Sequence, residues 1–309
     1  MSVGGPYAAW LDQGRRLHLQ HGPIDLIIEA SGAVDQTRLA YDRAWARFQT
    51  VLSGLVAELP RLRSLCPPAG LGVRGPIARR MERAVRPFAA HGITPMAAVA
   101  GAVADEMLTA MTKGLALERA CVNNGGDIAL VLKGDRRYRI AIVGRPHNPV
   151  VFGRIELRAG DPVGGIATSG RHGRSHSLGI ADSVTVLAKT AAGADAAATL
   201  IANAVDLPGH PGIRRVPARD LDPDSDLGSR LVTVDVAPLD PAETSGALDA
   251  GVGCAEAFHR RKTIAAAVLC LDDQIRLIGD MPSWSVSAAP PMVALPPRPL
   301  MSMKETRLA

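Results

Sequence analysis

A run of strands with glycine-marked turns constrains this fold more than any other feature of the sequence. In "CVNNGGDIALVLKGDRRYRIAIVG" (121–144) the helical spacing of apolar residues gives way to a strand-like pattern with a period of two, which is interrupted at Gly-Gly and at Gly-Asp. A period of two places successive side chains on opposite faces of a strand. Glycine pairs suit tight hairpin turns. The pattern predicts three consecutive strands joined by two hairpins.

The rest of the chain adds strands and helices in mixed order. "RRLHLQHGPIDLIIEASG" predicts a hairpin at His21-Gly22-Pro23, and Asp272-Asp273 marks another. Helices are expected over 35–59, where Pro60 ends the pattern, from Thr94-Pro95 onward, over 191–205 and after Asp240-Pro241. The predicted fold class is α+β, with antiparallel sheets and packed helices.

Proline-rich and glycine-rich stretches suggest where the packed domain ends. Residues 206–229 combine Pro, Gly and Asp, which predicts an exposed connection or a lid. Residues 286–309 are rich in proline and predict a mobile C-terminal tail. We therefore expect one α+β domain over 1–285 and a tail over 286–309.

Composition excludes several classes of protein. Hydrophobic residues make up 47% of the 309 positions and aromatic residues only 3%, so the core must consist mainly of aliphatic side chains. The net charge is +5, but the basic residues are dispersed and lack interleaved aromatics, which argues against nucleic acid as a partner. The first thirty residues do not resemble a secretory leader, and no apolar run could span a bilayer, so a cytoplasmic protein without a membrane segment is expected.

The first candidate for chemistry is a pair of oxygen donors in "AGADAAATLIANAV". Asp195 and Thr199 are four residues apart, so they share one face of the predicted helix. Hard oxygen donors suit Mg²⁺, which takes few protein ligands and completes its shell with water and phosphate oxygens. The alternative is that Asp195 complements the dipole of its own helix.

Two polar turns are the remaining candidates. In "NNGGD" (123–127) the glycines expose backbone N–H groups that could bind an anion, whereas ordinary hairpin chemistry is the alternative. "TSGRHGRSH" (168–176) ends a strand in a basic loop. Its spacing does not fit zinc, and His176 is a candidate acid or base, with a solvated surface histidine as the alternative.

Taken in order, "GAVA", "NNGGD", "TSG" with a following histidine, "ADSVTVLA" and "ADAAAT" resemble the ApbE family of FAD:protein FMN transferases, over roughly Gly101 to Val205. The resemblance implies a T-fold-like α+β architecture and Mg²⁺-dependent transfer of FMN from FAD to a hydroxyl of an acceptor protein, with AMP leaving. It implies the following site residues: Asp195, Thr199 and the carbonyl of Ala104 at the metal; Asn123, Asn124, Gly125, Gly126 and Asp127 lining the flavin nucleotide pocket; Thr168, Ser169 and Gly170 beside it; and His176 near the reacting phosphate.

Departures from the family pattern keep other functions open. Asp105-Glu106 replace the family's Lys-Gly, and "SLGI" follows His176 where the family has "IIDP". These changes indicate a divergent subfamily. The alternatives to flavin transfer are cleavage of the FAD phosphoanhydride, a distinct metal-dependent enzyme that acts on a small anionic metabolite through the His176 loop and Asp105-Glu106, and a flavin-binding accessory protein without catalysis. A homodimer is also left open.

Overall fold

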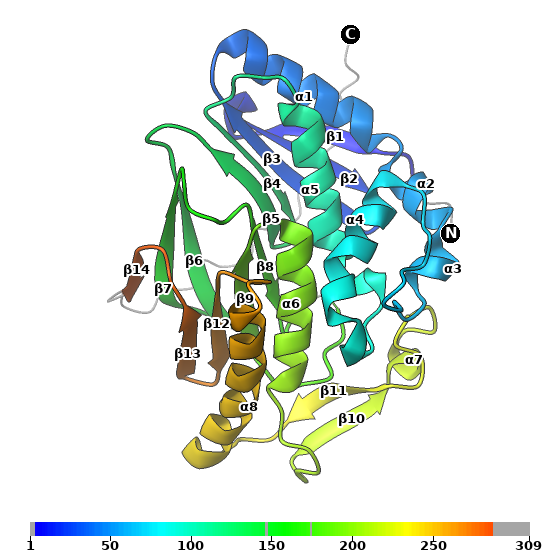
Figure 1. The fold of residues 1–309 in the computed structure, drawn as a ribbon, viewed down its shortest axis with the longest axis vertical. Coiled ribbons are helices and arrows are strands. Elements are labelled where there is room, and N and C mark those ends of the chain that lie inside the picture. Colours follow the sequence, from blue (N-terminus) through cyan, green and yellow to red (C-terminus); the bar gives the residue numbers. More distant parts are fainter. Residues whose placement is uncertain (1–3, 146–147, 174, 287–309) are drawn as a thin grey trace, which may run out of the picture.

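The computed structural model describes residues 4–145, 148–173 and 175–286. Its central element is a nine-stranded antiparallel sheet with the strand order β1-β2-β3-β4-β5-β8-β9-β12-β13 (Figure 1). The strands of this sheet are β1 Tyr7–Leu11, β2 Arg16–His21, β3 Ile24–Ser31, β4 Arg119–Asn124, β5 Asp127–Leu132, β8 Gly165–Ser169, β9 Ser183–Ala188, β12 Ala266–Leu271 and β13 Gln274–Gly279.

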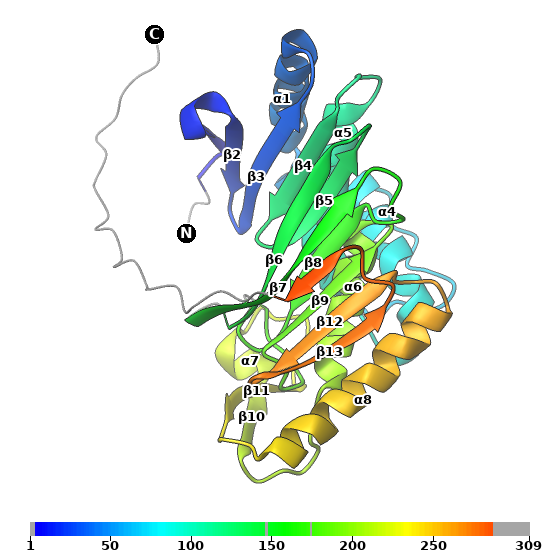
Figure 2. The same cartoon turned by 90° about the vertical axis from the view of Figure 1, so that its left-hand side faces the viewer.

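Helices gather on one face of this sheet, as the view along the sheet makes plain (Figure 2). The α-helices are α1 Val34–Phe48, α2 Val51–Val56, α3 Leu59–Leu62, α4 Pro76–Val85, α5 Val99–Thr112, α6 Ala191–Ala204, α7 Ala218–Leu221 and α8 Pro241–Arg260. The 3-10 helices are η1 Asp12–Gly14, η2 Arg86–His91 and η3 Pro95–Ala98. The predicted α+β class with antiparallel sheets and packed helices is confirmed.

Two smaller sheets complete the fold. One has the order β14-β7-β6 and covers part of the other face of the central sheet, with β6 Arg137–Arg145, β7 Asn148–Arg158 and β14 Trp284–Val286. The other pairs β10 Ile213–Pro217 with β11 Leu231–Val236. Between the central sheet and the helices lies an aliphatic core rich in alanine, and a second core lies under β6 and β7.

Several hairpins and helix starts were predicted correctly. β2 pairs with β3 around Gly22, β4 with β5 around the Gly-Gly turn, and β12 with β13 around Asp272-Asp273. α8 begins at the predicted place because the Asp240 side chain accepts from the N–H groups of Ala242 and Glu243.

Three predictions about local structure were wrong. The single helix over 35–59 is three helices, α1 to α3, whose breaks leave the buried series Phe48, Val51 and Leu55 intact. β6 forms no hairpin with β5, because β8 takes that edge of β5 and β6 crosses to the smaller sheet. Residues 206–229 contain β10 and α7, so this segment is structured rather than a plain connection.

The predicted tail over 286–309 lies outside the described residues except for Val286, the last residue of β14. Among the described residues, we find no helix that combines the length and the hydropathy needed to cross a bilayer.

Candidate functional site

The "NNGGD" turn is held rigidly against the start of α5. Gly125 and Gly126 form the β4–β5 turn with φ of +63° and +115°, a region that side-chain-bearing residues rarely adopt. The side-chain oxygen of Asn123 accepts from the Gly126 N–H at 2.8 Å, and the Asn124 amide donates to the carbonyl of Ala100 at 3.0 Å. The two asparagines therefore fix the turn and join it to the first turn of α5.

Asp195 caps that same helix. The residue before α5, Ala98, offers no side-chain cap. Instead, the Gly101 N–H donates to the Asp195 carboxylate at 3.0 Å, and the Ala100 N–H also donates to it. These are N–H groups that a helix cannot satisfy within itself. Asp195 therefore caps the neighbouring helix in addition to lying near the N-terminal end of its own helix.

Gly101 makes this contact between α5 and α6 geometrically possible. A Cβ atom at Gly101 would lie 2.6 Å from the Ala192 nitrogen and nearer still to the Ala191 carbonyl. Only a residue without a side chain fits where the first turns of the two helices meet. The N-terminal ends of α5 and α6, which carry partial positive charge, consequently lie together beside Asp195.

A second carboxyl group completes the centre of the site. Asp127, the first residue of β5, is hydrogen-bonded to Asp195, and its Oδ1 also accepts from the Thr168 N–H at 3.3 Å. We call Asp127 and Asp195 the carboxyl pair. Burial and then the nearby Asp127 carboxyl raise the pKa of Asp195 well above its ordinary value. Two acids in contact must share a proton or hold a cation between them, because two bare negative charges repel.

The acids that follow "GAVA" have structural partners. Asp105 accepts from the N–H groups of Ala191 and Ala192, both at 3.0 Å, and so caps α6 as Asp195 caps α5. Burial raises the pKa of Asp105. Glu106 forms ion pairs with Arg47 at 3.0 Å and Arg80 at 2.9 Å. Burial alone would raise the pKa of Glu106, but hydrogen bonds from these arginines outweigh it and lower the pKa.

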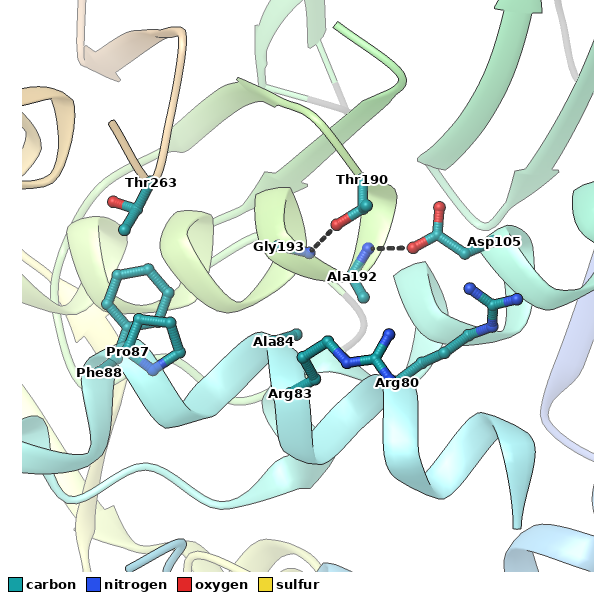
Figure 3. Close-up of a pocket in the computed structure, with 10 residues that line it drawn as sticks. All are labelled: Arg80, Arg83, Ala84, Pro87, Phe88, Asp105, Thr190, Ala192, Gly193 and Thr263. Atoms are coloured by element: carbon teal, nitrogen blue, oxygen red, sulfur yellow. Dashed lines mark hydrogen bonds between the residues drawn. The ribbon is translucent and has the colours of Figure 1, made fainter. Parts of the chain in front are cut away.

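A cavity of about 190 Å³ lies beside the first turn of α6 (Figure 3). Arg80 and Arg83 of α4 extend toward it, and Asp105 binds the Ala192 N–H at its edge. Thr190 accepts from the Gly193 N–H at 3.1 Å, so the first turn of α6 is already satisfied by protein groups. Neither member of the carboxyl pair lines this cavity, which separates it from the site predicted from the sequence.

The "TSG" residues lie where β8 ends. Thr168 is exposed, and its hydroxyl is 2.9 Å from that of Thr185 on β9. Ser169 is half-buried. A Cβ atom on Gly170 would meet the Asp182 carbonyl at 2.5 Å, so glycine is needed where the chain passes β9. The backbone contact with Asp127 brings Thr168 to the carboxyl pair.

His176 directly precedes residues that are anchored near the C-terminal end of α6. The residues that follow it, Ser177 and Leu178, hydrogen-bond to Asn203. Asn203 is just over two turns beyond Asp195 on α6, roughly 12 Å along the helix axis. His176 itself is half-buried. Its predicted role near a reacting phosphate stays a prediction.

A different histidine in the same loop is tied to a buried acid. His172 Nε2 lies 3.0 Å from Asp182 Oδ1, to which Arg171 donates from Nε at 3.0 Å and from Nη2 at 2.7 Å. The Asp272 N–H donates to the other oxygen of Asp182 at 2.8 Å. The Asp182 side chain is fully buried, so these donors stabilise its charge. This cluster fixes the loop after "TSG" to β9 and β12.

The predicted metal ligands are only partly brought together. The hydrogen-bond partners of the Asp195 carboxylate are Gly101, Ala100 and Asp127, whereas half-buried Thr199 lies one turn further along α6. Ala104 is buried inside α5, one turn beyond the residues that Asp195 contacts. Within the described ranges, no cluster of three or more His, Cys, Asp or Glu side chains could hold a metal. The assignment of Thr199 and Ala104 to the metal stays a prediction.

Sequence reasoning missed the partnership of Asp127 with Asp195 and the Asp182 cluster. Both join residues that are distant in the chain, so no local spacing reveals them. The one available signal for Asp182 is its position: it is an acid that directly precedes the strand sequence SVTVLA of β9.

The chain is similar to a family of known proteins. A family model described as "AbpE bacteria" matches residues 8–277. The UPF0280 protein of Methanopyrus kandleri is 40% identical over 129 residues, which cover 41% of this chain and 48% of that protein. The UPF0280 protein of Methanothermobacter thermautotrophicus is 39% identical over 133 residues, covering 43% and 49%. The chain thus spans about half the length of these curated relatives.

Solved structures of flavin transferases are also similar, at low identity. A mutant form of the flavin transferase ApbE from Vibrio cholerae aligns with 14% identity and a TM-score of 0.43, covering 89% of this chain and 97% of that one. The apo form of the Pseudomonas stutzeri flavinyl transferase ApbE aligns with 13% identity and a TM-score of 0.39, covering 90% and 96%. Membership rests on the family model, which spans most of the sequence: the chain belongs to the bacterial ApbE family described as "AbpE bacteria".

Proposed function

We propose that this protein is a metal-dependent enzyme that binds FAD and transfers its FMN part to a hydroxyl group of an acceptor protein, or cleaves the FAD phosphoanhydride with water. The observation that carries the proposal is the carboxyl pair, held under the Gly125-Gly126 turn and against the first turn of α5. Membership of the ApbE family supports the same class of reaction.

The residues present fit a divalent cation. Asp127 is buried and Asp195 half-buried, and they lie in contact where burial penalises their charged forms. A cation between them would remove both the repulsion and the need for a shared proton. Carboxylate oxygens are the ligands that Mg²⁺ prefers, and few protein ligands suffice because water and phosphate oxygens complete its shell. We propose Thr199 and the carbonyl of Ala104 as further ligands.

When bound, the cation would neutralise charge on the pyrophosphate of FAD. The chain's own groups supply the other requirements. The exposed Gly125-Gly126 turn lets a ligand approach the backbone closely, while the Asn123 contact keeps the turn in one conformation. The converging N-terminal ends of α5 and α6 favour negative charge nearby. Exposed Thr168, tied to Asp127 through its N–H, adds a polar residue next to the pair.

The main alternative is a distinct metal-dependent enzyme that acts on a small metabolite through the His176 loop and the acids Asp105 and Glu106. The structure disfavours it because Asp105 caps α6 and Glu106 is paired with two arginines. A flavin-binding accessory protein would keep the same pocket and differs only in turnover.

Thermal unfolding of the purified protein with FAD, FMN or ADP, each with Mg²⁺ or EDTA, tests this proposal. A ligand that binds only the folded state at about a hundred times its Kd adds about 2.7 kcal/mol, which raises Tm by roughly 5 °C for a chain of this size. FAD with Mg²⁺ should give the largest shift, EDTA should remove it, and Asp195→Asn should abolish it. Asp249→Asn, on the exposed side of α8, is the matched control.

If no nucleotide shifts Tm in either buffer, the proposal is wrong. FAD binding without release of AMP and without transfer of FMN to protein would instead favour a flavin-binding accessory protein.

A further inference from the structure

The ribbon formed by β6 and β7 has two chemically different faces. Its strands pair with Arg137 opposite Arg158, Arg139 opposite Glu156 and Ala141 opposite Arg154. Directly opposed residues of an antiparallel pair point to the same side. The intervening residues, such as Ile142, Ile155 and Leu157, are buried in the core beneath the ribbon.

The outer side is almost entirely basic. We call it the arginine face; its members are Arg137, Arg139, Ala141, Arg154, Glu156 and Arg158. Exposed fractions are 51% for the Arg137 side chain, 74% for Arg139 and 55% for Arg158. All three contact the same carboxylate, that of Glu156, at 2.8, 2.9 and 3.2 Å. Arg154 is exposed as well, so one acid faces four arginines.

This arrangement does not serve stability. Like charges directly opposite each other in a sheet destabilise the pairing, as Arg137 and Arg158 do here. A single carboxylate cannot neutralise four guanidinium groups, so the face keeps three positive charges in excess. A ribbon whose inner side is fully packed needs only neutral polar residues outside. The excess charge is therefore explained better by a partner than by folding.

The arginine face leads toward the proposed reaction site. At one end of the ribbon, the Ser183 hydroxyl donates to the Val143 carbonyl at 3.1 Å. Ser183 begins β9 and directly follows Asp182, which holds Arg171 and His172 in the loop after "TSG". A chain lying along the ribbon would thus reach the loop that continues from Thr168.

We propose that the arginine face docks an acidic segment of the acceptor protein and guides it to the carboxyl pair. This inference rests on the proposed function, because it assumes that the acceptor is a protein. Guanidinium groups bind carboxylates through two parallel hydrogen bonds, so neighbouring arginines on a flat ribbon match a segment rich in Asp and Glu.

Nucleic acid is the other polyanion that a basic ribbon could hold. The arginine face carries no aromatic side chain on which a base could stack. The absence of a stacking platform therefore favours a protein segment.

The test uses the full chain and fluorescein-labelled probes followed by fluorescence anisotropy. The probes are a short peptide with one threonine flanked by Asp and Glu, the same peptide with Asn and Gln in their place, and a short DNA duplex. The variant is Arg139→Gln with Arg158→Gln. Arg260→Gln with Arg261→Gln, at the end of α8, is a control with the same change in charge.

We expect the acidic peptide to bind the wild type, with Kd rising about tenfold or more between about 50 and 300 mM NaCl. The ribbon variant should weaken this binding about five- to tenfold, as the loss of two charge contacts implies, and the control less than twofold. Equal binding of the neutral peptide, equal loss in the control, or tighter binding of DNA with the same arginine dependence would each overturn the inference.

The FAD-dependent thermal shift separates this inference from the proposed function. The ribbon variant should keep the wild-type shift with FAD and Mg²⁺, which also shows that it folds. If the wild type binds the acidic peptide but shows no FAD shift, the proposed function fails and the acidic docking surface stands. If FAD shifts the wild type but the acidic peptide does not bind, only the docking inference fails.

Discussion

Removing one charge from the carboxyl pair should stabilise the metal-free protein. Asp127→Asn keeps an oxygen that can accept from the Thr168 N–H, and its new amide group can donate to Asp195. Two unit charges about 4 Å apart repel by about 4 kcal/mol at an effective dielectric constant near 20. The pair avoids part of this repulsion by keeping a proton. We therefore expect the variant to gain roughly 1–3 kcal/mol in the free energy of unfolding at pH 7.5 in EDTA.

The sign of the pH dependence follows from the raised pKa of Asp195. Above the ordinary pKa of an aspartic acid, the folded state binds more protons at this site than the unfolded state. The contribution of the pair is thus most favourable at or below about pH 4 and is lost as pH rises toward the raised pKa. The difference between variant and wild type should be small near pH 4 and reach its full size above the raised pKa.

Urea unfolding followed by circular dichroism at several pH values measures this difference. Adding Mg²⁺ should stabilise the wild type more than Asp127→Asn, because the variant lacks one charged ligand. Asp249→Asn should behave as the wild type throughout. A variant that is no more stable than the wild type in EDTA at pH 7.5, or that gains as much from Mg²⁺, would refute the reasoning.

Three further predictions concern the packing and charges around the site. Gly101→Ala should lower the free energy of unfolding by about 2–3 kcal/mol, because the new Cβ overlaps the start of α6. A free energy of unfolding from urea titration that equals or exceeds that of the wild type would contradict this. Glu106→Gln should cost about 1–2 kcal/mol at pH 7, and the loss should vanish as pH falls through the lowered pKa of Glu106, as urea titrations at pH 7 and at acidic pH would show. His176→Ala should slow release of AMP from FAD about a hundredfold or more with little change in stability, whereas His172→Ala should destabilise the protein by about 1 kcal/mol through its loop. Chromatography of the products measures the rate, and thermal unfolding measures the stability. An unchanged rate in His176→Ala would exclude that residue from the mechanism.

The elements that the sequence predicted well are those specified by neighbouring residues. The glycines between β4 and β5 allow one turn geometry, and Asp240 with Pro241 marks the start of α8. In both places the determining contacts lie within a few residues. Local pattern therefore fixed these elements before any tertiary contact was known.

The wrong predictions depend on which distant segment occupies a shared position. The residues near Gly134 do not specify that β8, rather than β6, pairs with β5. The helix predicted over 35–59 breaks at Gln49-Thr50 and again at Ala57-Glu58, and the Glu58 carboxylate binds the N–H groups of Arg74 and Gly75 before α4. The apolar periodicity indicates which side of these helices is buried. It does not indicate whether one continuous helix axis runs through the whole segment.

The candidate site shows the same difference between local contacts, which the sequence predicts, and contacts between distant segments, which it does not. The motifs located Asp127, Thr168 and Asp195, and the structure joins them through hydrogen bonds. The sequence paired Asp195 with its helical neighbour Thr199, because spacing along one helix is visible in a sequence. Its contact with Asp127 depends on how α6 lies across the sheet, which no local spacing encodes.

Crystals soaked in MnCl₂ with FAD, measured at a wavelength where manganese scatters anomalously, would show whether the carboxyl pair holds a divalent cation. We predict one strong anomalous peak within coordination distance of the carboxylate oxygens of both Asp127 and Asp195, with phosphate density next to it, and no such peak in Asp195→Asn. An anomalous map without manganese at the carboxyl pair, while FAD is bound, would show that the pair is not the metal site.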